Sequence, residues 1–201
     1  MKITVIEGNN ILNFNEDPQD VQNQIPGWYL ISDSAWTNAG KPFFYPENTD
    51  LVHVSLAPVI RANRLGKYIA KKFASRYYSE FAPALHFTLP TLRSELIFKG
   101  LSPEPAVSFD RSLIVGSFTP IPETENNSLL QLKINGETVA TWNHAGMKFS
   151  IDDIIAGISK TNTVKMGDFI IPVLCGSYPV KIGDFLEVTG QFTTPLTVKV
   201  K

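Results

Sequence analysis

The chain carries, at residues 51–66, the stretch LVHVSLAPVIRANRLG, which says most about the fold. Its first ten residues are mostly apolar, with valine and isoleucine prominent, a composition typical of a buried β-strand. Successive side chains of a strand point to opposite faces, so His53, Ser55 and Ala57 share one face. We therefore expect a strand over Leu51–Ile60 that carries these three residues on the same side of a sheet.

Much of the remaining chain also predicts short strands, because apolar, β-branched and aromatic runs alternate with Pro, Gly and Asn. The other predicted strands are Ile3–Ile6, Trp28–Ile31, Ser112–Phe118, Leu129–Ile134, Thr138–Trp142, Asp168–Cys175, Phe185–Gln191 and Leu196–Val200. Asn135-Gly136 lies between two of these runs and predicts a type I′ hairpin, since that turn needs positive φ at both central positions.

Three segments predict helices. The clearest begins at Ser150, which forms a capping box with Asp153, and its apolar stripe consists of Ile151, Ile154, Ile155 and Ile158. A second helix is predicted over Lys67–Tyr78, where we interpret the charge run Lys71-Lys72 as a solvated face, and a short third over Thr91–Phe98. The pattern predicts an α+β, mainly β protein with a few short helices, in a single domain over residues 1–201.

Length, charge and cysteine content narrow the function classes. A chain of 201 residues can bury a full hydrophobic core. Its 18 basic and 19 acidic side chains give a net charge of −1, which argues against nucleic acid as a partner. The single Cys175 excludes an internal disulfide and favours a cytoplasmic location. Residues 1–20 contain no long apolar run, so we expect neither a signal peptide nor a transmembrane helix, and no membrane partner.

Several motifs, taken in order, resemble those of the fumarylacetoacetate hydrolase (FAH) family, especially its short bacterial members. They include Gly40-Lys41-Pro42, Arg64-Leu65-Gly66, Phe87-Thr88, Phe109-Asp110 and Lys181-Ile182-Gly183-Asp184. The resemblance covers roughly residues 3–190. It implies a mixed β-roll or β-sandwich of the FAH type, in which residues 1–40 pack on a β-roll core of residues 41–201, and it implies a homodimer.

Enzymes of this family hold Mg²⁺ or Mn²⁺ on carboxylates and act on 2-oxo acids or acylpyruvates. The resemblance places Ser55, Ala57 and His86 where the family has two Glu and one Asp. It places Phe14 and Val107 at the catalytic His and Lys positions, and Pro90 at an Arg position. We therefore expect no catalytic residue, metal or cofactor of the family kind. The former cleft is predicted to be lined by His53, Ser55, Ala57, His86, Thr88, Val107 and Val173.

Two interpretations of function stay open. In the first, the chain is a non-catalytic homologue, a pseudoenzyme, whose former cleft is filled or binds a small ligand or a partner. In the second, it is a divergent metal-dependent hydrolase or decarboxylase of a small 2-oxo acid. His53 and His86 would then hold a transition metal such as Zn²⁺, which imidazole suits better than Mg²⁺. We interpret Cys175 as a small buried hydrophobe rather than a nucleophile, and the acidic residues of segment 16–20 as solvated charge.

Overall fold

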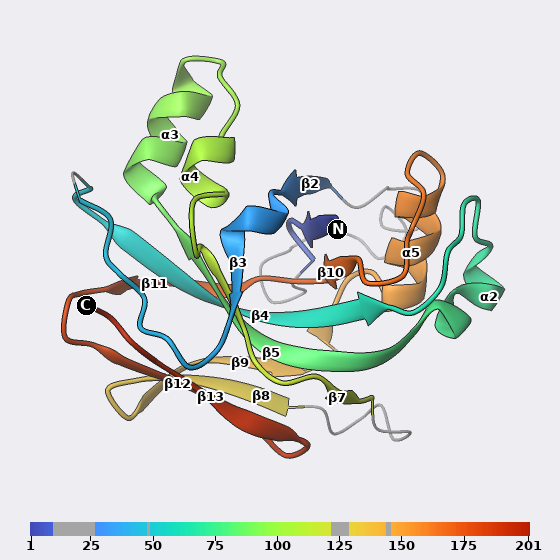
Figure 1. Ribbon diagram of the computed structural model, residues 1–201. Coiled ribbons are helices and arrows are strands. Elements are labelled where there is room, and N and C mark those ends of the chain that lie inside the picture. Colours follow the sequence, from blue (N-terminus) through green and yellow to red (C-terminus); the bar gives the residue numbers. More distant parts are fainter. Residues whose placement is uncertain (10–26, 48, 122–128, 144–145) are drawn as a thin grey trace.

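The computed structural model describes residues 1–9, 27–47, 49–121, 129–143 and 146–201 (Figure 1). These residues form a nine-stranded mixed sheet, a four-stranded antiparallel sheet and a few short helices, which confirms the predicted mainly β class. Within the same ranges, no helix is long and apolar enough to cross a membrane. Phe14 and the acidic segment 16–20 lie outside the described residues.

The large sheet is built around the antiparallel pair β4 (Val52–Ala62) and β5 (Tyr78–Thr88). The strands beyond β4 are β10 (Phe169–Ile171), β1 (Ile3–Ile6) and β2 (Trp28–Ile31), and those beyond β5 are β6 (Leu113–Val115) and β3 (Trp36–Asn38). In addition, β4 pairs with β11 (Cys175–Val180) and β5 with β7 (Thr119–Pro120). The described part of residues 1–40 thus supplies three strands of this sheet, and the β1–β10 and β3–β6 contacts are parallel.

The second sheet has the order β13 (Thr193–Lys199), β12 (Phe185–Gly190), β8 (Leu129–Ile134) and β9 (Glu137–Asn143). Between β8 and β9, Asn135 and Gly136 have φ angles of 52° and 89°. Both lie in the left-handed region that a type I′ turn requires, so the predicted hairpin is confirmed. The edge strand β13 continues to Val200, which bridges to Phe43.

The strand β5 was not predicted from the sequence, although it is one of the two longest. Pro83 lies at its middle and faces Pro58 of β4 directly across the ladder. A proline inside a run of residues argues against a central strand because it cannot donate a ladder hydrogen bond. Gly116, after β6, donates its N–H to the Pro83 carbonyl at 2.8 Å. A Cβ at Gly116 would lie only 3.1 Å from that oxygen, tighter than an ordinary contact, so this close approach favours glycine.

The helices are α2 (Lys71–Ala74), α3 (Pro90–Phe98), α4 (Glu104–Val107) and α5 (Ile151–Ser159). In α5 the Ser150–Asp153 capping box forms, and all four predicted isoleucines are at most 4% exposed, which confirms the stripe. Each such burial contributes about 1.5–3 kcal/mol. The predicted helix over Lys67–Tyr78 is wrong in extent, because Tyr68 has a φ of 55° and the helical part is limited to α2 and a 3-10 turn, Ser75–Tyr77.

Two hydrophobic clusters lie on opposite faces of the β4–β5 pair. The first contains Leu56, Leu85 and the isoleucines of α5 together with the inner face of the small sheet, including Leu132 and Val188. The second contains Ala57, Ala84, Val107, Leu113 and Ile171. The predicted single strand over Asp168–Cys175 is wrong, since the chain leaves the sheet at residues 172–174 between β10 and β11. Pro172 begins that break, because proline lacks the N–H that the ladder needs.

Candidate functional site

The register of β4 and β5 brings most of the predicted cleft residues together. Ser55 lies directly opposite His86, His53 lies opposite Thr88, and Ala57 lies opposite Ala84. Because side chains alternate along a strand and directly opposed residues share a face, all six residues point to one side of the pair. That side carries the second hydrophobic cluster, so the polar group formed by His53, Ser55, His86 and Thr88 borders an apolar interior.

His86 is completely buried and has one hydrogen bond. Its Nε2 donates to the Val107 carbonyl oxygen at 2.9 Å, because a carbonyl can only accept. The other ring nitrogen, Nδ1, is buried without a hydrogen-bond partner among the described residues. Burial lowers the pKa of His86 to about 4, although the bond to Val107 acts in the opposite direction. At neutral pH the side chain is therefore an uncharged imidazole, with one lone pair that none of the described residues engages.

Ser55 and His53 are held by the start of β11. Ser55 is 4% exposed, and its Oγ donates to the Gly176 carbonyl oxygen at 2.6 Å. His53 is partly exposed, and its Nδ1 is 2.8 Å from Oγ of Ser177. Desolvation lowers the pKa of His53 below its ordinary value. The backbone around Gly176, which has a φ of 70°, thus closes over this end of the β4 strand.

The apolar positions of the predicted cleft divide between the two cores. Ala57 is fully buried and Val107 is 2% exposed, both in the second cluster beside His86. Val173 is not part of this lining, because it packs in the first cluster, while the next residue, Leu174, packs against the second. Pro90 is the first residue of α3, a position where its missing N–H costs nothing. Phe14 lies outside the described residues, so its predicted place in the cleft stays a prediction.

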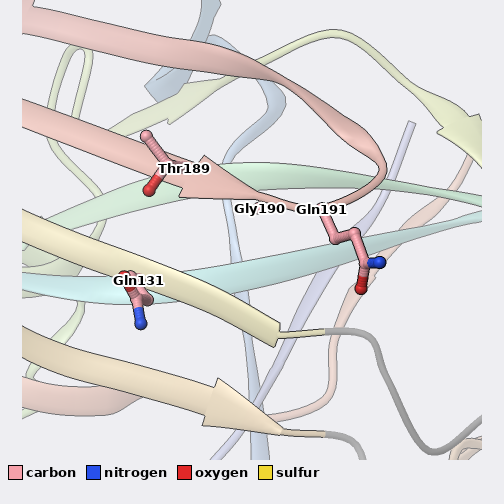
Figure 2. A pocket seen from close by; sticks show the side chains of 4 residues that line it. All are labelled: Gln131, Thr189, Gly190 and Gln191. Carbon is pink, nitrogen blue, oxygen red and sulfur yellow. The ribbon is translucent and has the colours of Figure 1, made fainter.

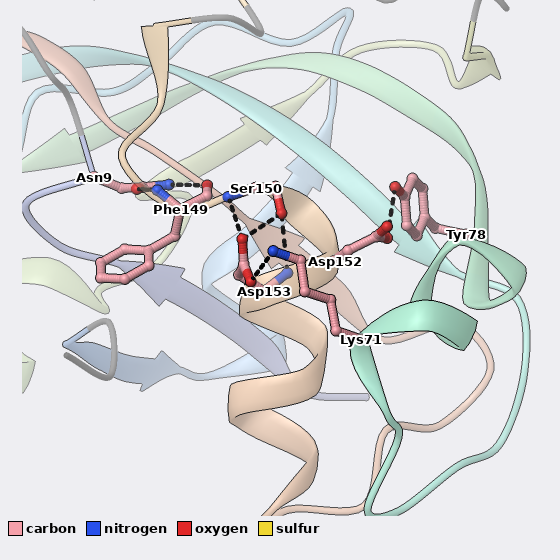
Figure 3. A network of polar contacts seen from close by, with 7 residues as sticks. All are labelled: Asn9, Lys71, Tyr78, Phe149, Ser150, Asp152 and Asp153. Carbon is pink, nitrogen blue, oxygen red and sulfur yellow. Dashed lines mark hydrogen bonds and ion pairs between the residues drawn. The ribbon is translucent and has the colours of Figure 1, made fainter. Parts of the chain in front are cut away.

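Asn9 supports the site but was not predicted from the sequence. It is 1% exposed, and its side-chain amide donates to the carbonyl oxygens of Pro172 at 2.7 Å and Phe149 at 3.1 Å. Figure 3 shows the contact with Phe149. Its Oδ1 accepts the Phe149 N–H at 2.6 Å. The residue therefore ties the end of β1 to the loop 172–174 and to the start of α5. A lone asparagine between Gly8 and Asn10 carries no sequence signal of burial, so the sequence offered no way to find this role.

A charged pair lies at the other end of the second cluster and was also missed. Arg93 of α3 donates from Nη2 to Oε1 of Glu7 at 2.6 Å, linking the end of β1 to that helix. Tyr29 packs against the second cluster, and burial followed by the charge of Glu7 raises the pKa of its phenol. Tyr29 is therefore a protonated hydrogen-bond donor throughout the physiological range. Val5 directly opposes Tyr29 across the β1–β2 pair. Because residues two apart along a strand share a face, the step from Val5 to Glu7 was the sequence signal that could have placed Glu7 near Tyr29.

The donors at the β4–β5 site do not fit Mg²⁺ or Mn²⁺. These hard cations need several oxygen ligands, normally with carboxylate charge, and the site offers two hydroxyls, of Ser55 and Thr88, and two imidazoles. Among the described residues, no three His, Cys, Asp or Glu side chains gather as a metal site would need. Cys175 is 4% exposed in the first cluster, and burial raises the pKa of its thiol to about 12, which supports the interpretation as a buried hydrophobe.

Two surface hollows lie apart from this site. One, of about 280 Å³, is lined on the small sheet by Gln131, Thr189, Gly190 and Gln191, all uncharged (Figure 2). The other, of about 400 Å³, contains Arg61 and Phe118. The Arg61 guanidinium is already bonded to Glu80 and lies 4.3 Å from the centre of the Phe118 ring. That cation is therefore engaged within the protein.

Comparisons with known proteins agree with this architecture. Residues 6–200 match the model of the fumarylacetoacetate (FAA) hydrolase C-terminal family. The chain is 30% identical over 204 residues to mitochondrial oxaloacetate tautomerase FAHD1 of Bos taurus, covering 100% of this chain and 91% of the relative. It is 27% identical over 191 residues to oxaloacetate tautomerase YcgM of Escherichia coli, covering 92% and 86%.

Solved structures give the same answer for the fold. Fumarylpyruvate hydrolase from Pseudomonas aeruginosa, solved in complex with Mn²⁺ and pyruvate, superposes with a TM-score of 0.88 at 18% identity and covers 100% of this chain and 89% of that one. A fumarylpyruvate hydrolase homologue from Burkholderia cenocepacia gives 0.88 at 19% identity, covering 100% and 88%. Because the family model matches residues 6–200, nearly the whole of this chain, the chain belongs to the fumarylacetoacetate hydrolase family.

Proposed function

We propose that this chain is a non-catalytic member of the family, which has lost the metal-dependent reaction and keeps the cleft face for a small ligand or a partner. The observation that carries the proposal is the Ser55–His86 pair. Both side chains are buried, neither carries charge at neutral pH, and each donates its proton to a backbone carbonyl, of Gly176 and Val107 respectively.

A divalent cation at this pair would be energetically unfavourable. It would have to lose its hydration shell in a largely apolar interior without a compensating carboxylate, and burial of an uncompensated charge costs at least several kcal/mol. Coordination by the Ser55 hydroxyl would also weaken its hydrogen bond to the Gly176 carbonyl, and His86 has only Nδ1 to offer, since its Nε2 already donates to Val107.

The test measures interconversion of the enol and keto forms of oxaloacetate, because the relatives from Bos taurus and Escherichia coli are named oxaloacetate tautomerases. The decay of enol absorbance is followed with Mg²⁺ or Mn²⁺, and the Escherichia coli relative is assayed in the same buffer as the positive control. We expect the rate with this chain to equal that of buffer with metal alone. Turnover that depends on metal and is lost in a His86→Asn variant would contradict the proposal.

A second candidate is the divergent enzyme with an altered metal site. It is favoured by the unpartnered Nδ1 of His86, since a buried lone pair without a donor is uncommon and a metal would satisfy it. His53 is the second imidazole on the same face. Titration with Zn²⁺ separates the candidates: tight binding lost in both His53→Asn and His86→Asn supports the enzyme, and binding unchanged in either variant excludes this site.

A further inference from the structure

Two surface loops lie side by side at the end of the molecule formed by α2 and α5 (Figure 1). One leads from β4 into α2, and the other follows α5. Gly66 and Val164 join them by two backbone hydrogen bonds of 2.9 and 2.8 Å, forming an isolated bridge. We call residues 64–76 together with residues 160–166 the basic face.

The basic face concentrates positive charge in a chain whose net charge is −1. Its two segments contain no Asp or Glu, and they hold seven of the 18 basic residues, namely Arg64, Lys67, Lys71, Lys72, Arg76, Lys160 and Lys165. From the neighbouring α5, Asp153 pairs with Lys71 at 2.7 Å, and Asp152 accepts the Tyr78 hydroxyl at 3.0 Å. Across the described part of the chain, none of the other six cations is ion-paired with a carboxylate.

Large apolar side chains stand among these cations. Leu65 is 70% exposed, Tyr68 73% and Met166 76%, and all three belong to the two bridged loops. Phe73 is 41% exposed, and its ring lies 5.0 Å from the Lys72 ammonium and 4.8 Å from the Arg76 guanidinium. Exposed apolar surface is unfavourable in water, at about 25 cal/mol for each Å². A surface that combines exposed apolar side chains with unpaired cations therefore marks a contact site.

The loop that presents Leu65 and Tyr68 is fixed by the protein interior. Ser159, itself fully buried, accepts the Tyr68 N–H with its carbonyl oxygen and the Ile69 N–H with its Oγ, both at 2.9 Å. Gly66 lies against the Tyr77 ring so closely that an added Cβ would overlap it. The backbone that carries Leu65 and Tyr68 is therefore already ordered, so docking on a partner would not have to pay for ordering this loop.

We propose that the basic face docks on an anionic lipid surface, with Leu65, Tyr68 and Met166 entering the boundary between headgroups and acyl chains. The cations complement the negative surface potential of such a membrane, and the apolar side chains leave water for the acyl region. A nucleic acid would satisfy the cations and could stack on Tyr68 or Phe73, but it offers nothing to Leu65 and Met166. The combination thus favours lipid over a polyanion.

A peripheral contact of this kind needs no spanning helix. The expectation of no membrane partner rested on the lack of a long apolar run in the sequence, and the proposal replaces it. It also replaces the interpretation of Lys71-Lys72 as a merely solvated face. The α3 end of the molecule provides a natural contrast, because Ile97, Phe98 and Leu101 are 51, 92 and 55% exposed there with Lys99 engaged by Glu95.

The test is sedimentation of the full chain with vesicles of phosphatidylcholine alone or in an equimolar mixture with phosphatidylglycerol. A charge variant changes Lys67, Lys72, Lys160 and Lys165 to Gln, and an apolar variant changes Leu65, Tyr68 and Met166 to Ser. The matched control changes Ile97, Phe98 and Leu101 to Ser. Thermal unfolding of every variant verifies that it is folded before binding is compared.

We expect binding to the anionic vesicles only, weakened by salt. Each cation removed should reduce the partition coefficient about fivefold, hence several hundredfold for four. The apolar variant should lose at least tenfold, whereas the control variant keeps wild-type binding. Equal binding to both vesicle types, no binding to either, or wild-type binding by the apolar variant overturns the proposal. Tighter binding to duplex DNA than to anionic vesicles also overturns it and assigns the face to nucleic acid.

Discussion

Replacement of His86 by aspartate tests whether the buried face can accept the carboxylate that the family places there. The matched control is His86→Asn, because asparagine has nearly the same size and shape as aspartate but carries no charge. The described residues place no cation in hydrogen-bond contact with this position, whose recorded partner is the Val107 carbonyl. An ionised carboxylate there would lose its hydration and face a carbonyl oxygen.

The size of the effect follows from proton linkage. A carboxylate too costly to bury binds a proton instead, and its pKa in the unfolded chain is about 3.9. Holding it protonated costs up to about 5.6 kcal/mol at pH 8 but only about 1.5 kcal/mol at pH 5. Because the folded pKa is raised, the stability lost at pH 8 returns as the pH falls. The aspartate variant should therefore gain up to about 4 kcal/mol relative to the asparagine variant between pH 8 and pH 5.

Urea unfolding of the two variants, followed by tryptophan fluorescence at both pH values, measures this difference. The experiment is repeated with Mg²⁺ in excess, where we expect no more than about 0.5 kcal/mol of stabilisation, since a ligand stabilises only the state that binds it. Two results would refute the reasoning. Equal stability of both variants at pH 8 would mean that water or a cation reaches residue 86, and strong stabilisation of the aspartate variant by Mg²⁺ would mean that the metal site is close to intact.

Three further predictions concern the whole molecule. The free energy of unfolding of the wild type should fall by up to about 3 kcal/mol as the pH drops from 6.5 to 4, because the pKa of His86 is about 4 in the folded protein and ordinarily 6.5. Urea unfolding measures this fall, which the His86→Asn variant should lack. Gly116→Ala should destabilise by about 1–3 kcal/mol, since its Cβ would press on Pro83, while Gly146→Ala, with open space, should stay near wild type in the same assay. Light scattering should give twice the 22.3 kDa monomer mass, and a monomer would contradict the expected homodimer.

The features that the sequence predicted well are those determined within a few residues. The Asn135-Gly136 turn and the Ser150–Asp153 capping box both satisfy backbone groups locally, and their spacing alone identifies them. The isoleucine stripe of α5 repeats at helical spacing and packs on the sheet as expected. Strands β1, β2 and β8 begin and end where their apolar runs do.

The errors arise where distant residues decide the local conformation. The helix predicted to begin at Lys67 does not form there because Tyr68 has a φ of 55°, in a loop that Ser159 holds through the backbone N–H groups of Tyr68 and Ile69. At the site, alternation placed His53, Ser55 and Ala57 on one face correctly, but only the register with β5 reveals that Ala57 faces apolar Ala84 while His53 joins the polar group. Val173 was placed in the cleft by the family resemblance alone, and the structure packs it in the first cluster, while its neighbour Leu174 packs against the second.

The facing prolines of β4 and β5 determine where the large sheet divides. Beside Pro58, pairing with β11 ends at Leu56 and pairing with β10 begins at Ile60. Beside Pro83, pairing with β6 ends at Ala84 and pairing with β7 begins at Phe81. Neither proline has an N–H to donate to the strand outside the β4–β5 pair. On both sides of the pair, one flanking strand therefore ends beside the proline and another begins.

Each change forces the chain out of the sheet, at residues 172–174 on one side and at residues 116–118 on the other. The first departure is anchored by Asn9 and adjoins the polar group of β4, and the second forms the rim of the Arg61 hollow. The two prolines, which lack N–H groups, are thus the points at which the flanking strands are exchanged and at which two surface loops begin. The positions of both loops along the scaffold therefore depend on the proline pair together with anchors such as the bond from Asn9 to the Pro172 carbonyl.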